Sequence, residues 1–196
     1  MSARLFCLTS SAEDLTLLPA LAEAGVDGFQ VRDKSLPTGA LVALTRSVLA
    51  AVRPYGATVV VNDRLDVALA AGADGVHLGT SDLAVADARR LAPGLLVGAT
   101  CRSRAEVVAA AGAGADYAGF GPVLATSSKS GLPTPLGFAA VTAAAGVLPL
   151  VAIGGLGTDS AAQARAAGAF GVAVIGAIWR QPDPVGSAKE LVAAVG

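Results

Sequence analysis

The phrase Ala71-Gly72-Ala73-Asp74-Gly75 is one of four similar phrases that divide the chain into repeated units. The other three begin at residues 24, 112 and 167. In each phrase a glycine is suited to end a helix in the left-handed conformation, and the residues after it turn the chain into a strand. The phrases recur after about two strand-helix units, and this spacing predicts a repeated βα architecture.

Short apolar segments of strand length alternate with amphipathic segments of helix length along the whole chain. The predicted strands lie near residues 5–8, 28–31, 58–61, 75–78, 95–98, 117–120, 150–153 and 172–175. The helical patterns begin near Ala12, Thr38, Leu65, Val85, Ser103, Phe138, Asp159 and Pro184. Several strands are apolar at every position, as expected of parallel strands covered on both faces. The pattern predicts a single α/β domain over residues 1–196, a (β/α)8 TIM barrel, and fits an open doubly wound sheet less well.

The composition argues against nucleic-acid and membrane partners. Fourteen basic and 15 acidic residues give a net charge of −1, too little for an electrostatic footprint on either surface. Apolar runs are shorter than the roughly 20 residues of a membrane-spanning helix, and no signal peptide precedes the first strand pattern. We therefore expect a cytoplasmic protein. Hydrophobic residues make up 54% of the chain, which is compatible with a homo-oligomer that buries apolar helix surface.

The sequence lacks the motifs of several common reactions. It contains no G-x-S-x-G elbow, no H-E-x-x-H, no Walker loop and no G-x-G-x-x-G after the first strand. Cys7 and Cys101 have neither metal-ligand spacing nor a histidine partner, and we expect both to be buried thiols. Covalent hydrolysis and nicotinamide chemistry are therefore disfavoured.

Polar residues gather directly after the predicted strands, where a TIM barrel carries its active site. Gln30 and Arg32 at the second strand point to one side by strand alternation, and Lys34 follows in the loop. An amide and two cations placed in this way are suited to bind phosphate. A solvated run of charges is the alternative interpretation.

Two carboxylates follow neighbouring strands. Asp63, in Asn62-Asp63-Arg64, comes after the third strand, and Asp82 comes after the fourth. Together they could hold Mg²⁺ and, through it, a diphosphate. The alternative is that each caps the helix that follows it. The only histidine, His77, lies within the fourth strand pattern and is expected to pack there or to support its neighbours.

The later strands end in hydroxyls and glycines. Thr100 follows the fifth strand, and residues 121–131 after the sixth carry several hydroxyls and Lys129. This loop is either solvated and mobile or suited to bind an oxyanion without a nucleophile. Gly154 and Gly155 follow the seventh strand and Gly176 follows the eighth, where glycines let backbone N–H groups approach a phosphate. A purely geometric role is the alternative for Gly154 and Gly155. The residues thus predict one phosphate pocket at strands seven and eight and a metal-assisted anion site at strands two to six.

Five motifs in order resemble the thiamine phosphate synthase family and its thiazole tautomerase relatives. They are QVRDK from residue 30, VNDR from 61, GADGVHLG from 72, DYAGFGPV from 116 running into TSSK, and VAIGGL from 151. The resemblance spans nearly the whole chain. It implies a Mg²⁺-dependent transferase with two phosphorylated small-molecule substrates, hydroxymethylpyrimidine diphosphate and thiazole phosphate. Pyrophosphate would leave first, and the thiazole nitrogen would capture the pyrimidine carbocation to give thiamine phosphate.

The resemblance also implies roles for individual residues. Asp63 and Asp82 would be the Mg²⁺ ligands. The diphosphate would be held by the implied catalytic residues Arg32, Lys34, Asn62, Thr100 and Lys129. Gln30 would help to seat the pyrimidine. The thiazole phosphate site would be lined by Thr126, Ser128, Gly155, Ile175 and Gly176.

The chain departs from the family at several of these positions. Thr100 stands in place of a serine and Ser128 in place of a threonine, so both hydroxyls are kept. Thr80-Ser81 replaces a glutamine followed by an acidic residue, and Gly176 replaces a serine. The histidine of the tautomerases is Arg102 here, which removes the expected agent of proton transfer. A metal-independent thiazole tautomerase and a phosphate-binding barrel without catalysis are the two alternatives to a synthase.

Overall fold

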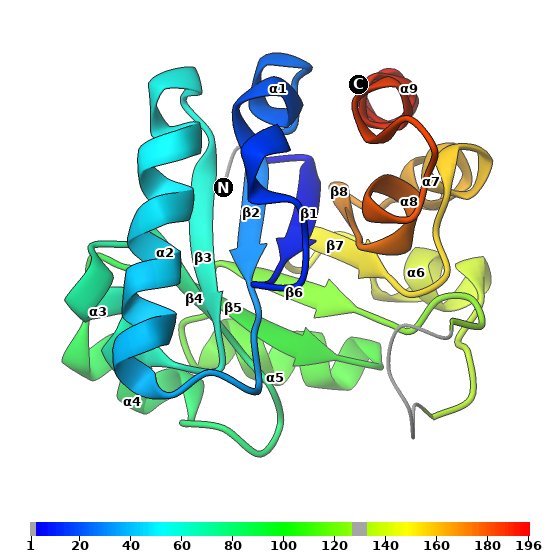
Figure 1. Cartoon of the computed structure of the whole chain (residues 1–196). Coiled ribbons are helices and arrows are strands. Elements are labelled where there is room, and N and C mark those ends of the chain that lie inside the picture. The colour runs from blue at the N-terminus through cyan, green and yellow to red at the C-terminus, as the bar shows by residue number, and fades with distance from the viewer. Residues whose placement is uncertain (1–2, 127–132) are drawn as a thin grey trace.

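The computed structural model describes residues 3–126 and 133–196, and within them eight strands form a closed barrel (Figure 1). The strands are β1 (Leu5–Thr9), β2 (Gly28–Val31), β3 (Thr58–Asn62), β4 (Gly75–Leu78), β5 (Leu96–Cys101), β6 (Tyr117–Phe120), β7 (Leu150–Ile153) and β8 (Gly171–Val174). Each pairs in parallel with the next, and β8 pairs with β1. The predicted TIM barrel is confirmed, and the open sheet is wrong.

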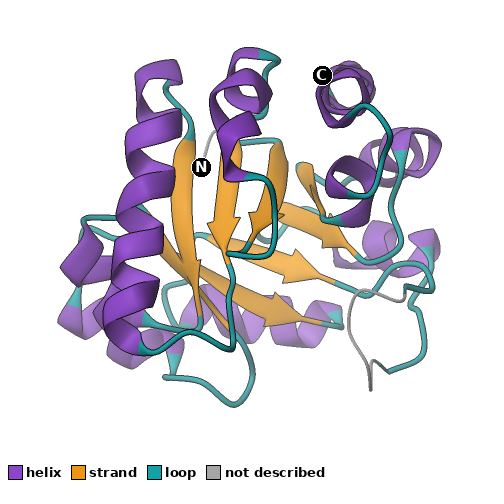
Figure 2. Cartoon of the chain, viewed as in Figure 1, coloured by secondary structure: helices purple, strands orange, loops and turns teal. Residues whose placement is uncertain are grey.

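Helices surround the barrel and cover its outer face (Figure 2). They are η1 (Leu15–Leu17), α1 (Leu18–Glu23), α2 (Thr38–Val52), η2 (Arg53–Tyr55), α3 (Leu65–Ala71), α4 (Val85–Leu91), α5 (Arg104–Gly112), α6 (Phe138–Ala144), α7 (Thr158–Ala166), α8 (Gly176–Trp179) and α9 (Pro184–Val195). The pattern expected from Ala12 begins only at Leu15, and α8 was not predicted, because four residues are too few to show a helical period. No helix in the described ranges is long and apolar enough to cross a membrane.

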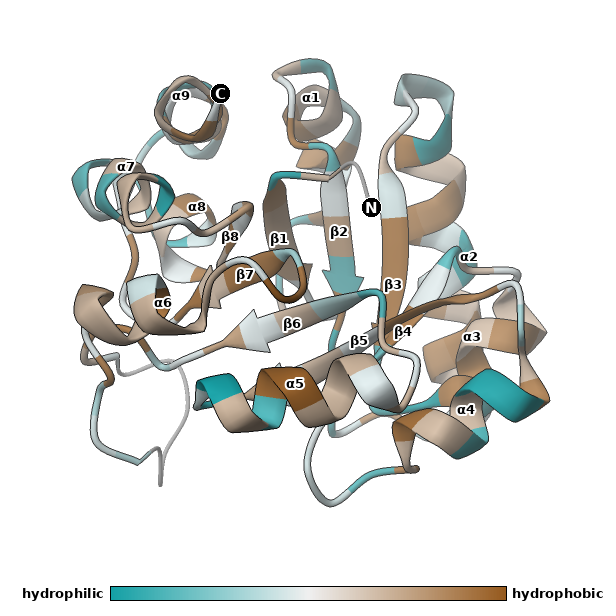
Figure 3. Ribbon diagram, turned by 180° about the vertical axis from the view of Figure 1, so that it is seen from behind, coloured by the Kyte–Doolittle hydropathy of each residue, from teal (hydrophilic) through white to brown (hydrophobic). Residues whose placement is uncertain are grey.

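Strand alternation divides the apolar side chains between two cores. Val59 and Val61 of β3 face outward and pack with the helices, whereas Val60 packs inside the barrel with Phe6 and Tyr117. The hydrophobic colouring of β3 and β7 in Figure 3 reflects this burial on both faces. The two cysteines are buried free thiols as expected, and burial raises their pKa values to about 12 and about 11.

The four repeated phrases form the predicted helix-to-strand turns. Their glycines Gly25, Gly72, Gly114 and Gly168 have φ values of 105°, 74°, 94° and 100°, a region that disfavours other residues. Each turn therefore depends on a glycine at this position.

The aspartates of three of these phrases have a role that the sequence did not reveal. Each carboxylate accepts a hydrogen bond from the backbone at the start of the preceding strand. The pairs are Asp27 with Leu5 N at 2.8 Å, Asp74 with Val59 N at 2.8 Å and Asp116 with Val97 N at 2.7 Å. We call these contacts the carboxylate ties. They join β1 to β2, β3 to β4 and β5 to β6 at the N-terminal ends of the strands.

The fourth phrase has no such tie, because Phe170 stands where the others have an aspartate. Instead the guanidinium of Arg4 lies over the Phe170 ring, 5.8 Å from its centroid. The backbone of Arg4 also donates to Asp27 at 2.9 Å, so this one residue contacts the turns that precede β2 and β8.

Candidate active site

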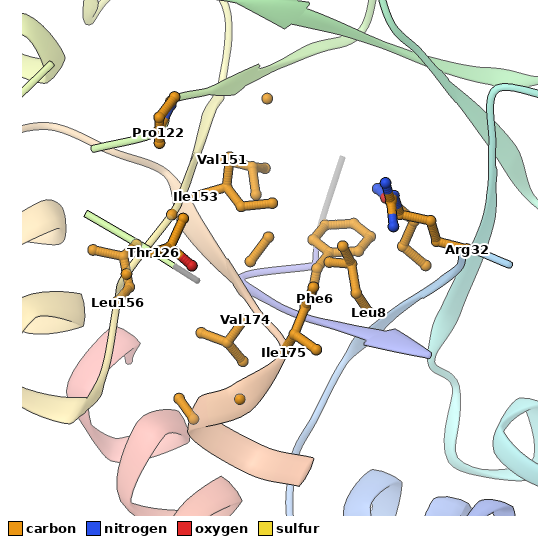
Figure 4. Close-up of a pocket in the computed structure, with 18 of the residues that line it drawn as sticks. Phe6, Leu8, Arg32, Pro122, Thr126, Val151, Ile153, Leu156, Val174 and Ile175 are labelled. Carbon is orange, nitrogen blue, oxygen red and sulfur yellow. The ribbon is translucent and has the colours of Figure 1, made fainter. Parts of the chain in front are cut away.

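A cavity of about 550 Å³ opens at the C-terminal ends of the strands. Inward-facing barrel residues form its floor, and the segments after β2, β6, β7 and β8 form its walls. Figure 4 shows Arg32 on one side and Thr126 on the other, with Phe6 and Leu8 between them. The predicted site residues that line the cavity are Gln30, Arg32, Asn62, Thr100, Thr126, Gly155, Ile175 and Gly176. The predicted residues Ser128 and Lys129 lie outside the described part of the chain.

The β2 side of the cavity is polar. Gln30 and Arg32 both reach it, as strand alternation predicted, while Val31 between them packs against the helices. Asn62 reaches it from the end of β3. Within the described residues, the guanidinium of Arg32 and the amide of Asn62 have no hydrogen-bond or ion-pair partner, so both are available to a ligand.

His77 lies in the cavity wall and connects two other polar side chains. Its Nδ1 lies 3.2 Å from the Tyr117 hydroxyl, and its Nε2 lies 3.0 Å from the Thr100 hydroxyl. Burial lowers the pKa of His77 to about 4, against a weaker opposing effect of Asp63, so the ring is neutral at pH 7. A neutral imidazole donates from one nitrogen and accepts at the other, which fixes the orientation of the Thr100 hydroxyl.

Two glycines make room for this cluster. A Cβ atom at Gly119 would lie 2.6 Å from Cε1 of His77, and one at Gly98 would overlap the ring of Tyr117. Both roles expected of His77 are found, because the ring packs against Tyr117 and also holds Thr100, a residue predicted to bind substrate.

Asp63 and Asp82 lie beside each other next to Gly79, close enough for each carboxyl group to shift the pKa of the other. Burial and the adjacent Asp63 raise the pKa of Asp82. Burial opposes ionisation of Asp63 as well, but the interactions with Asp82 and with Lys34 outweigh it and lower the pKa of Asp63. Lys34 Nζ lies 3.1 Å from Asp63 Oδ2.

Neither aspartate caps a helix, so that alternative is wrong. The residues at the capping positions of α3 and α4 are Arg64 and Ala84, without a side-chain cap. Asp82 accepts from Gly79 N at 2.7 Å instead. Asp63 has a φ of 64°, the only positive value at a non-glycine residue in the described ranges. Such a backbone is uncommon and is concentrated at functional sites.

The acidic pair fits a magnesium ion in its chemistry. Mg²⁺ prefers oxygen ligands and is usually held by one or two carboxylates, with water or substrate phosphate at the other positions. No group of three acidic, histidine or cysteine side chains suited to a metal occurs in residues 3–126 and 133–196. An ion at Asp63 and Asp82 would therefore keep positions open for a diphosphate. Lys34, predicted to bind that diphosphate, is instead paired with Asp63 and is absent from the cavity lining.

Glycines form the β7 and β8 side of the cavity. Gly154 and Gly155 have φ values of 103° and 68°. A Cβ at Gly154 would lie 2.6 Å from Cβ of Pro122, and one at Gly155 would overlap the carbonyl oxygen of Ala125. These glycines are thus required by the turn, and the same turn places their backbone in the cavity wall.

Arg180 and Gln181 also line this side, and sequence reasoning missed them. They follow α8, the short helix that shows no period, although a basic residue soon after the eighth strand was a usable signal. Gln181 Nε2 donates to Gly176 O at 2.9 Å. Arg102, by contrast, bonds to the carbonyls of Gly121 and Thr134 at 3.4 and 3.1 Å and is not part of the lining.

These features define a class of protein: a TIM-barrel enzyme with a site for small anionic substrates at the C-terminal ends of its strands. The chain belongs to the thiamine monophosphate synthase family, whose model matches residues 5–178. The resemblance inferred from the five motifs is confirmed.

Individual relatives agree with the family match. A thiamine-phosphate synthase of Anaeromyxobacter dehalogenans is 45% identical over 193 residues, which cover 97% of this chain and 86% of that protein. A thiamine biosynthesis bifunctional protein of Symbiobacterium thermophilum is 48% identical over 96% of this chain, which spans 40% of the longer protein. The solved structure of a thiamine phosphate pyrophosphorylase from Pyrococcus furiosus superposes with a TM-score of 0.90 at 31% identity, covering 99% of this chain and 96% of that one.

Proposed function

We propose that this chain is a thiamine phosphate synthase, a transferase that joins hydroxymethylpyrimidine diphosphate to thiazole phosphate and releases pyrophosphate. The observation that carries the proposal is a cavity that joins two sides: the β2 side has a guanidinium and an amide without partners among the described residues, and the β7 and β8 side has glycine-lined backbone. One side suits a diphosphate and the other a second phosphate. The acidic pair beside the first side suits Mg²⁺.

The diphosphate side stabilises the leaving group. In the reaction the bond between the pyrimidine methylene carbon and the diphosphate oxygen breaks, and its electron pair leaves with pyrophosphate. Arg32 and Asn62 donate to the charge that develops there, and Thr100 adds a hydroxyl held in place by His77. Mg²⁺, when bound, supplies further positive charge to the leaving group.

The apolar strip between the two sides protects the carbocation that remains. Phe6, Leu8, Val151 and Ile153 line the cavity, and Figure 4 shows Phe6 and Leu8 between Arg32 and Thr126. They provide flat contacts for two aromatic rings and exclude water, which would otherwise capture the cation as an alcohol. The thiazole nitrogen then forms the new C–N bond with its own lone pair, so no protein nucleophile is needed.

Lys34 has a place in this sequence of events. Its ammonium group lies 3.1 Å from Asp63 Oδ2 and neutralises that carboxylate. Asp63 and Asp82 would hold the metal ion, whose charge would take the place of the ammonium group, and the Lys34 side chain, which is 60% exposed, would then be free to turn to the diphosphate.

The test is formation of thiamine phosphate from the two substrates, measured by chromatography with Mg²⁺ and with EDTA. Asp63→Asn is the suitable variant, because asparagine tolerates positive φ better than alanine does. We expect it and Lys129→Ala each to lower the rate on the order of 100-fold. Asp66→Asn, an exposed carboxylate paired with Arg64, is the matched control. Full activity in EDTA contradicts the metal assignment, and no product under any condition contradicts the synthase.

The thiazole tautomerase is the weaker candidate. Its expected proton carrier is replaced by Arg102, whose guanidinium donates to the carbonyls of Gly121 and Thr134 and has no acceptor atom. Incubation with the thiazole carboxylate phosphate in EDTA should therefore give no aromatised product. Ligand binding without either reaction would favour a barrel without catalysis.

A further inference from the structure

Arg180 is a cation of the cavity wall to which neither the motifs nor the mechanism above gives a role. It follows α8 and lines the cavity beside Gly176. Within the described part of the chain its guanidinium has no hydrogen bond and no ion pair. Most other arginines are engaged, as Arg102 and Arg165 are with backbone carbonyls. Arg180 thus shares with Arg32 the property of an unpaired guanidinium in the cavity wall.

A side chain at Gly176 would crowd the stem of Arg180. A Cβ atom at Gly176 would lie 3.3 Å from Cδ and 3.8 Å from Nε of Arg180. The arginine stem therefore passes directly over the glycine. The backbone of Gly176 is not in the left-handed region, so its conformation alone does not require glycine.

The segment that carries Arg180 is held in place on both sides. Trp179 Nε1 donates to Leu8 O at 2.8 Å, which ties the segment to the end of β1. Arg180 N and Gln181 Nε2 both donate to Gly176 O, at 3.2 and 2.9 Å. The backbone of Arg180 is therefore held in place, whereas its guanidinium has no partner among the described residues. This arrangement is expected of a residue that binds a ligand.

We propose that Arg180 binds the phosphate of the thiazole substrate and compensates for the missing side chain at Gly176. A guanidinium presents two parallel N–H donors to a phosphate, and such charge-assisted pairs are stronger than a bond from a neutral hydroxyl. The proposal rests on the proposed function for the identity of the substrate. It assigns Arg180 to the thiazole phosphate and leaves Arg32 to the diphosphate.

Steady-state kinetics of Arg180→Ala test the assignment. We expect KM for thiazole phosphate to rise about 10- to 100-fold, with KM for the pyrimidine diphosphate unchanged. Arg180→Lys should lie between, because it keeps the charge and loses the paired donors. Lys189→Ala on α9, an exposed cation away from the cavity, is the control for net charge. Equal KM values in Arg180→Ala and the unaltered protein, or an equal rise for both substrates, overturn the proposal.

A second variant tests the link to Gly176. Gly176→Ser in the Arg180→Ala background restores a hydroxyl where the arginine stem no longer interferes, and it should recover part of the lost affinity. In the unaltered background the same serine crowds Arg180 Cδ and should weaken binding. If Gly176→Ser lowers the affinity for thiazole phosphate equally in both backgrounds, the proposed relation between Gly176 and Arg180 is overturned.

A binding measurement separates this proposal from the proposed function. Trp179 is the only tryptophan and adjoins Arg180, so its fluorescence reports on ligand binding. If the unaltered protein binds thiazole phosphate but forms no product, the synthase fails while Arg180 can still be tested. Loss of this binding in Arg180→Ala supports the assignment, and retention overturns it.

Discussion

Replacing Asp27 with alanine removes a carboxylate tie and should destabilise the barrel. The carboxylate accepts from the backbone N–H groups of Arg4 at 2.9 Å and Leu5 at 2.8 Å. Leu5 is 1% exposed, so its N–H group has no access to water after the substitution. A hydrogen bond to a charged group contributes about 1.5–3 kcal/mol, and a buried donor without a partner costs a similar amount. Because the hydrogen bond from Leu5 N counts fully and the one from Arg4 N in part, we expect the free energy of unfolding to fall by about 3 kcal/mol.

Urea denaturation followed by circular dichroism measures this loss. A loss of about 3 kcal/mol is a large part of the 5–15 kcal/mol typical of a domain and corresponds to roughly 10 °C in Tm at this chain length. Asp27→Asn keeps one acceptor oxygen and should lose about half as much. Glu23→Ala, an exposed carboxylate on α1, is the control. If the free energy of unfolding of Asp27→Ala lies within 0.5 kcal/mol of that of the unaltered protein, as is typical of a surface substitution, the reasoning is refuted.

Two further predictions concern the polar cluster. Gly119→Ala should push the His77 ring away from Thr100, because the added Cβ would lie 2.6 Å from Cε1 and 3.0 Å from Nε2 of the ring. We expect kcat to fall about tenfold while the fold is retained. His77 is the only histidine, so NMR should show one ring titrating near pH 4. In the unfolded chain the same ring takes up its proton near pH 6.5, so the unfolded state binds more protons between these values. The free energy of unfolding should therefore fall by about 2 kcal/mol from pH 7 to pH 5, and His77→Gln should abolish this fall.

The sequence predicted the strands well, because each apolar run is bounded by residues that cannot continue it. Gly72 marks the end of α3 and Gly168 the turn before β8. The side on which Gln30 and Arg32 lie followed from strand alternation alone. These are local properties, readable from neighbouring residues.

What sequence reasoning missed depends on residues that are far apart in the chain. Nothing near Asp27 indicates that its partner is Leu5, 22 residues earlier. Capping was a reasonable alternative for Asp82 until the structure placed it beside Asp63. Arg180 was missed because its importance comes from the cavity it faces.

The carboxylate ties lie at the N-terminal ends of the strands, and the cavity lies at the opposite ends. A protein engineer can therefore treat the two ends as independent. Exchange of the segments after β6, β7 and β8 leaves Asp27, Asp74 and Asp116 with all their backbone partners. Libraries aimed at new substrates should tolerate many changes at the C-terminal ends of the strands, while thermal stability is adjusted at the N-terminal ends. The turn at Phe170, which carries no tie, is the natural place to begin that second task.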